Sequence, residues 1–108
     1  MAWFMFQASY TPEAWAGQIK NPQERISAIN EMVKPTGATI KHAWYSFGEY
    51  DLLFLVEAPG NVETVGAVLA AASGGALKGI KTTPLLTPDE ALEAMKIAGK
   101  VQYQPPGQ

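Results

Sequence analysis

Residues 38–57, ATIKHAWYSFGEYDLLFLVE, decide the fold. Residues 38–47 are rich in aromatic and β-branched side chains, and residues 51–57 are almost uninterruptedly apolar, so each segment predicts a strand. Only a tight turn at Phe47-Gly48-Glu49-Tyr50 lies between them. Two strands joined so closely pair as an antiparallel hairpin, so the chain contains an antiparallel sheet.

Strands are also predicted on both sides of this hairpin. Residues 2–9 are rich in aromatic and long apolar side chains with few polar interruptions, a pattern typical of a buried strand. Residues 77–86 predict a fourth strand, in which Pro84 indicates a sheet edge or a bulge because proline cannot donate to the ladder.

Helices are predicted between the strands. Thr11-Pro12 indicates one helix start, and Asn21-Pro22-Gln23-Glu24 indicates a second, with its asparagine as the cap. Asn61 is predicted to cap a helix that follows the third strand. The apolar positions at helical spacing are Ile26, Ile29, Met32 and Val33, and then Val62, Val65, Leu69 and Ala72.

The element order is β-α-β-β-α-β with an extra C-terminal helix, the ferredoxin-like plan of α+β proteins. This last helix begins at the capping box Thr87-Pro88-Asp89-Glu90, and Leu92 and Met95 are expected to face inward. Residues 2–99 are expected to form one domain, and residues 100–108 a polar C-terminal tail.

Composition and charge argue against several functions. The net charge of −2 with scattered basic residues disfavours nucleic-acid partners and a polybasic membrane patch. The chain has no cysteine, which excludes disulfides, thiolate nucleophiles and zinc–thiolate sites. The N-terminus lacks the basic start of a signal peptide, and the apolar stretch at residues 65–72 is too short to span a bilayer. We therefore expect a cytoplasmic protein without a membrane partner.

The strands are apolar on both faces, and this pattern predicts a homodimer. Residues 3–6 and residues 52–56 are consecutive large apolar side chains. Two helices cover only one face of a four-stranded sheet, so the second face needs another cover. A second copy of the sheet, related by a two-fold axis, provides it. The alternative is that the C-terminal helix folds across that face.

The segment from Trp44 to Asp51, followed by Glu57-Ala58-Pro59, resembles the signature of the GYD domain family. Three further segments resemble the family: the opening aromatic strand with Tyr10-Thr11, the helix after Asn21-Pro22, and the closing Leu86-Thr87-Pro88-Asp89-Glu90. The similarity covers nearly all of residues 2–97. The resemblance implies a dimeric α+β barrel fold, and it implies no established activity.

His42 and Asp51 are the candidate catalytic residues. In an alternating strand His42 shares a face with Ile40 and Trp44, and an imidazole can move protons near neutral pH. Without cysteine or clustered carboxylates the single histidine makes a weak metal site, so we expect no metal, and a structural strand histidine is the alternative. Asp51 follows the turn and can act as a general acid or base. Alternatively, Asp51 accepts hydrogen bonds from turn amides.

Four aromatic residues are the candidate ligand-binding residues: Tyr10, Trp44, Tyr45 and Tyr50. Their flat rings and polar tips can line an aromatic pocket for a planar ligand, or they can pack in the core and the dimer interface. In the ferredoxin-like plan the first strand lies beside the third. We therefore expect a cavity bordered by His42, Trp44 and at least one of these tyrosines, with Asp51 nearby.

Two functions are compatible with these observations. The first is a small homodimeric enzyme, oxygenase-like or isomerase-like, that converts a planar or hydrophobic metabolite. The second is a non-catalytic dimer that binds a ligand or a protein partner. The sequence identifies no cofactor and does not decide between the two.

Overall fold

The structure is a computed structural model, and it describes residues 1–107. Its core is a four-stranded sheet in the order β2-β3-β1-β4, and every neighbouring pair of strands is antiparallel. The strands are β1 (Ala2–Tyr10), β2 (Thr39–Tyr45), β3 (Leu52–Ala58) and β4 (Leu77–Leu85). This result confirms the predicted α+β class, and the order is compatible with the ferredoxin-like plan.

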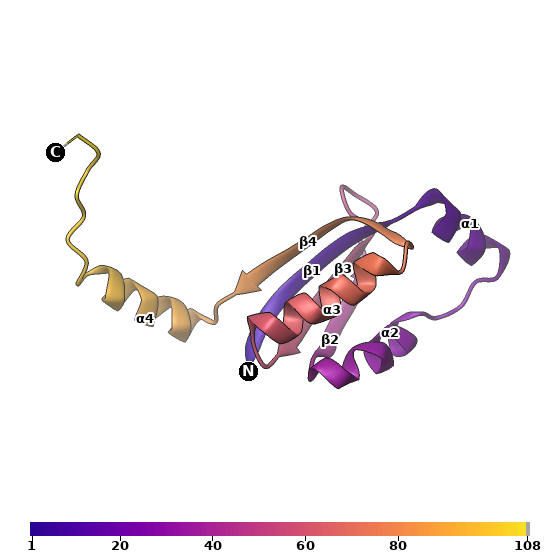
Figure 1. The fold of residues 1–108 in the computed structure, drawn as a ribbon, viewed down its shortest axis with the longest axis horizontal. Helices are drawn as coiled ribbons and strands as arrows, with labels where there is room; N and C mark the ends of the chain where they lie inside the picture. The colour runs from indigo at the N-terminus through magenta and orange to yellow at the C-terminus, as the bar shows by residue number, and fades with distance from the viewer. Residues whose placement is uncertain (108) are drawn as a thin grey trace.

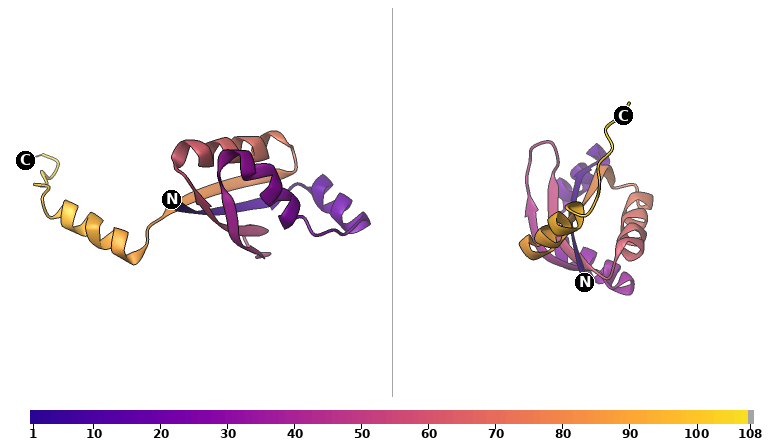
Figure 2. Two further views of the ribbon diagram at one scale, coloured as in Figure 1. Left: turned by 90° about the horizontal axis from the view of Figure 1, so that it is seen from below. Right: turned by 90° about the vertical axis from the view of Figure 1, so that its left-hand side faces the viewer.

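Two helices cover one face of the sheet (Figures 1 and 2). The helical elements are α1 (Pro12–Lys20), α2 (Ile26–Val33), the 3₁₀ turn η1 (Lys34–Thr36), α3 (Asn61–Ser73) and α4 (Pro88–Ala98). Helices α2 and α3 lie on the covered face, α1 lies beyond its end, and α4 stands apart from the sheet (Figure 1). The other face, called the open face below, has no helix of residues 1–107 lying across it (Figure 2).

The register assigns alternate side chains to the two faces. Phe6 of β1 lies opposite Phe54 of β3, and their stacked rings, with centroids 5.7 Å apart, face the helices. Met5 lies opposite Leu55, and both side chains belong to the open face, where they stay partly exposed. Because directly opposed residues share a face, the open face has an apolar centre. Its central residues are Trp3, Met5, Leu53 and Leu55.

A β-bulge in β2 changes the predicted face of one residue. Ile40 lies opposite Val56 and His42 lies opposite Leu55, so β2 advances two residues where β3 advances one. The bulge moves His42 to the open face while Ile40 stays on the helix side. The prediction that His42 shares a face with Ile40 is therefore wrong, because strict alternation does not hold across a bulge.

The starts of α2 and α3 also differ from the prediction. Helix α2 begins five residues after Asn21, and the Glu24 carboxylate caps it by accepting hydrogen bonds from the amides of Ile26 and Ser27. Asn61 is the first residue of α3, and its N-cap is Gly60, which has no side chain to cap with. The predictions that Asn21 and Asn61 cap these helices are therefore wrong. The later start of α2 is explained by the Glu24 carboxylate, which lies within reach of the first free amides of the helix.

Helix α4 is capped as predicted but is not packed inward. Thr87 and Glu90 form both hydrogen bonds of the capping box. Leu92 is 52% exposed and Met95 is 66% exposed. The prediction that these side chains face the core of their own chain is therefore wrong. The radius of gyration of 17.5 Å exceeds the ~13 Å expected of a compact chain of this length. The projecting α4 accounts for this extended shape (Figure 1).

Candidate functional site

A cavity of about 340 Å³ lies between the covered face of the sheet and the helices α2 and α3. Its floor is formed by Phe4, Phe6, Tyr10, Ile40, Leu52, Phe54 and Val56 of the sheet. The walls include Ile29, Met32 and Val33 of α2 and Thr64, Ala67, Val68 and Ala71 of α3. The lining is almost entirely apolar, with threonines, Tyr10 and Arg25 as its polar residues.

The cavity follows from which residues of α3 face the sheet. The inward positions carry short side chains, such as Ala67 and Ala71, while Val65 and Leu69 point outward and are more than half exposed. Thr64 is buried, and its hydroxyl donates to the carbonyl oxygen of Gly60 at 2.8 Å, so this polar group is satisfied within the helix. Short side chains opposite aromatic rings cannot fill the gap between helix and sheet.

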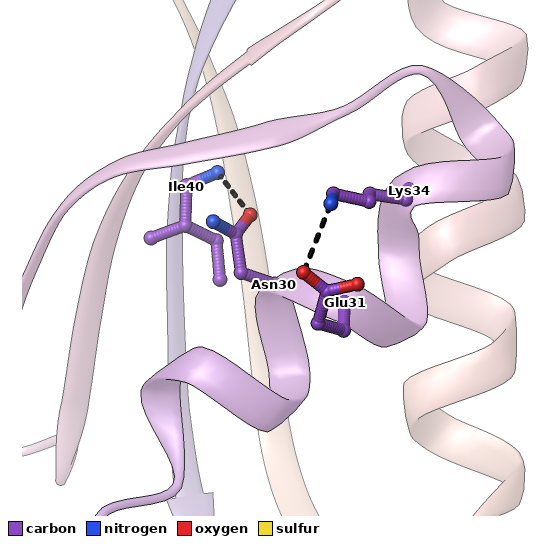
Figure 3. A network of polar contacts seen from close by, with 4 residues as sticks. All are labelled: Asn30, Glu31, Lys34 and Ile40. Atoms are coloured by element: carbon purple, nitrogen blue, oxygen red, sulfur yellow. Dashed lines mark hydrogen bonds and ion pairs between the residues drawn. The ribbon is translucent and has the colours of Figure 1, made fainter.

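The side chain of Asn30 connects the α2 wall to the sheet by a hydrogen bond (Figure 3). The Oδ1 atom of Asn30 accepts a hydrogen bond from the backbone amide of Ile40 at 3.0 Å, at the residue where the β2 bulge begins. On the outer side of α2 an exposed ion pair joins Glu31 and Lys34 at 2.9 Å. Exposed pairs of this kind contribute little to stability, so the Asn30 hydrogen bond and the packing of Ile29 and Val33 hold α2 on the sheet.

Tyr10 contributes a second buried hydroxyl to the lining of the cavity. The residue is 6% exposed, and its hydroxyl has no hydrogen-bond partner in residues 1–107. Burial raises the pKa of Tyr10 above 10.0, and the neighbouring Tyr45 raises it further, while the charge of Arg25 and the side chain of Gln18 oppose this rise. The hydroxyl is therefore neutral at physiological pH and lies among polar neighbours.

Asp51 fixes the backbone of Tyr10 from outside the cavity. Its Oδ2 atom accepts hydrogen bonds from the Tyr10 amide and from the Trp15 indole nitrogen, each at 3.0 Å. Its own amide donates to the carbonyl oxygen of Ala8 at 3.0 Å. The rings of Tyr10 and Trp15 meet edge to face, with centroids 5.1 Å apart. Asp51 thus joins β1, α1 and the hairpin loop.

His42 and Trp44 lie away from the cavity. Their rings stack with centroids 5.7 Å apart and planes 13° apart. Trp44 lies opposite Leu53, so both rings belong to the open face, and Trp44 is 54% exposed. The structure therefore separates this pair from Tyr10, which is the one residue of the predicted set that lines the cavity.

The two remaining tyrosines lie at the hairpin. Tyr45 stacks on Phe47 with centroids 5.9 Å apart, and Phe47 in turn stacks on Trp15. The ring of Tyr50 approaches Gly79 of β4, where an added Cβ would lie 3.8 Å from Cε1. Tyr45, Phe47 and Trp15 form one aromatic cluster with Tyr10, while Tyr50 lies against Gly79 of β4.

The profile of the GYD domain family matches residues 4–95. This chain belongs to the GYD domain family. A comparison with curated proteins found no match, and a comparison with solved structures found none either. Membership therefore confirms the resemblance seen in the sequence, and the cavity of this GYD domain is interpreted from its own residues.

Two further findings concern metal ligands and membrane-spanning helices. Over residues 1–107, no three histidine, aspartate or glutamate side chains gather closely enough to hold a metal ion. Within the same residues, no helix combines the length and the hydrophobicity that a bilayer crossing requires.

Sequence reasoning missed most of the residues that line the cavity of the GYD domain. Arg25 was not singled out, because a lone arginine before a helix resembles any solvated charge. Ala67 and Ala71 were missed because the stripe containing Val65 and Leu69 is the more apolar one. A stripe of small residues spaced three and four apart was the available signal.

Proposed function

We propose that this GYD domain protein is a homodimer that binds a small hydrophobic ligand in the cavity of each protomer. The observation that carries the proposal is the apolar cavity of about 340 Å³ between the sheet and the two helices. Its volume falls in the lower part of the range of small-molecule sites. The stacked rings of Phe6 and Phe54 on its floor suit a planar or aromatic ligand.

Binding without conversion is the activity that the lining supports best. Over the described residues, the cavity has no histidine, aspartate, glutamate or lysine in its walls. General acid–base catalysis needs a group that titrates near the working pH within reach of the ligand. Burial raises the pKa of Tyr10 away from neutrality, so the lining lacks the kind of group that an oxygenase-like or isomerase-like reaction would use. Recovery of a chemically altered ligand would favour the enzyme instead.

The dimer part of the proposal is supported by the open face. Its centre consists of Trp3, Met5, Leu53 and Leu55, four large apolar side chains on neighbouring strands. A contiguous apolar surface of this kind on a sheet is typical of a protein–protein interface. In its observed position α4 does not cover the apolar centre of the open face (Figure 2). The partner sheet is the remaining cover, and it completes a dimeric α+β barrel.

This arrangement gives the predicted catalytic residues different roles. His42 and Trp44 lie on the open face, so in the proposed dimer they belong to the interface. Asp51 positions Tyr10 through the backbone and does not line the cavity. We therefore propose His42 as an interface residue and Asp51 as a structural residue.

A neutral fluorescent probe tests the ligand site. N-phenyl-1-naphthylamine brightens when it enters an apolar cavity, and we expect saturable binding to the wild-type protein. Ala71→Phe fills the cavity, whereas Ala72→Phe adds the same ring at the next residue, which is exposed and does not line it. We expect at least tenfold weaker binding to Ala71→Phe and unchanged binding to Ala72→Phe.

Equal binding to both variants would place the probe on another surface and overturn the proposal. Filling an existing cavity is expected to leave the melting temperature unchanged or higher. If Ala71→Phe does not fold because the ring is too large, Ala71→Leu gives the same comparison with a smaller side chain.

A further inference from the structure

The hydroxyl of Tyr10 lacks a partner that the protein fold would normally supply. Buried hydroxyls are nearly always hydrogen-bonded, because an unpaired one has lost its water without replacement. The Tyr10 hydroxyl is buried and makes no hydrogen bond of good geometry in residues 1–107, although the side chains of Tyr45 and Gln18 lie close enough to influence its pKa. Tyr10 lines the cavity, so a ligand bound there is a source of the missing partner.

Arg25, whose side chain is exposed, adds a positive charge near Tyr10. It lines the cavity together with Tyr10, and its charge lowers the pKa of Tyr10 against the larger effect of burial. Neither of the ion pairs found in residues 1–107 involves Arg25. The adjacent Glu24 carboxylate accepts instead from the amides at the start of α2. The guanidinium is therefore available to an anion from outside the chain.

We propose that the cavity takes an apolar organic acid, an aromatic or hydrocarbon body that carries one oxyanion. The body lies against the apolar walls, and the oxyanion accepts hydrogen bonds from the Tyr10 hydroxyl and from the Arg25 guanidinium. Such charge-assisted hydrogen bonds are stronger than neutral ones, and arginine suits a carboxylate or sulfonate because it donates through two nitrogens. This inference rests on the proposed function and specifies its ligand.

Two fluorescent probes that share one skeleton test the proposal. 1-Anilinonaphthalene-8-sulfonate carries an oxyanion, and N-phenyl-1-naphthylamine is the same ring system without it. The measured quantity is the dissociation constant of the neutral probe divided by that of the sulfonate. This ratio cancels what the shared rings contribute, and it falls when sulfonate binding weakens. We expect Tyr10→Phe and Arg25→Gln each to weaken sulfonate binding about tenfold relative to the neutral probe. Arg25→Lys is expected to restore part of the preference, because the charge remains.

Matched controls separate this effect from general charge or surface binding. At exposed positions of the C-terminal region, Tyr103→Phe removes the same hydroxyl and Lys96→Gln removes one positive charge, and we expect the ratio to stay at the wild-type value.

Three outcomes are informative. A ratio that falls in both Tyr10→Phe and Arg25→Gln, and not in the controls, supports the proposal. Cavity binding of the neutral probe with an unchanged ratio overturns the acid preference and leaves the proposed function standing. Binding that Ala71→Phe does not weaken overturns the proposed function and this inference together.

Discussion

Asp51 accepts two hydrogen bonds with one oxygen atom, and it therefore matters to stability more than to ligand chemistry. Asp51→Ala leaves the Tyr10 amide and the Trp15 indole nitrogen without their acceptor. We expect a loss of about 2–4 kcal/mol in the free energy of unfolding, because each partly buried donor loses its partner. Urea unfolding followed by tryptophan fluorescence measures this loss.

Glu49→Ala, in the same loop, is the matched control, since the Glu49 side chain is exposed. Its effect is expected to stay within about 0.5 kcal/mol. If Asp51→Ala is as stable as the wild type but no longer binds the neutral probe, the structural role is contradicted. Asp51 would then belong to the ligand site, as the sequence predicted.

The buried Tyr10 hydroxyl is expected to make the stability of the fold pH-dependent in the alkaline range. Burial raises the pKa of Tyr10, with a further contribution from Tyr45, so the folded chain holds the phenol proton more tightly than the unfolded chain. The stabilisation is complete below the unfolded pKa of about 10 and is lost as the pH rises from there through the folded pKa. Between about pH 9 and 11 we expect the melting temperature of the wild type to fall more steeply than that of Tyr10→Phe.

Circular dichroism melts of the two proteins at matched pH measure this difference, and Tyr103→Phe should follow the wild type. If the melting temperatures of Tyr10→Phe and the wild type fall in parallel as the pH rises, ionisation of Tyr10 is not linked to folding.

At the scale of elements, the α2 wall depends on Asn30. Asn30→Ala leaves the Ile40 amide unpaired at the bulge, and we expect a loss of about 1–2 kcal/mol together with weaker probe binding, because the wall is no longer held. Glu31→Ala, one residue away, removes an exposed ion pair and should change stability by less than about 0.5 kcal/mol. Equal effects of the two substitutions would contradict the role given to Asn30.

The elements themselves were largely predictable, and their faces were less so. The short hairpin turn and the apolar strands predicted the sheet, and the Thr87 capping box predicted the start of α4. The bulge near Lys41 has no glycine or proline to mark it, so the face of His42 could not be predicted. Helix α3 has two stripes of helical spacing, and the more apolar stripe faces outward. The cavity forms because the stripe of small residues faces the sheet, so the sequence alone did not predict where the cavity lies.

For the whole molecule, two adjacent residues of β3 separate dimerisation from folding. Leu53 belongs to the open face, whereas Phe54 is 4% exposed and faces the cavity. We expect Leu53→Lys to give a folded monomer, because it places a charge in the interface and leaves the core intact. Phe54→Lys is expected to unfold the chain, because it buries an unpaired charge. Light scattering with circular dichroism distinguishes these results, and a dimeric Leu53→Lys protein would contradict the assigned interface.

The central claim is that a dimer of this chain holds one hydrophobic ligand in the cavity of each protomer. Native mass spectrometry of the wild type and Ala71→Phe, each with N-phenyl-1-naphthylamine, tests it most directly. The account predicts twice the monomer mass for both proteins, with one probe per protomer on the wild type and none on Ala71→Phe. A wild-type spectrum of monomers, or equal probe loading on the two proteins, would contradict it.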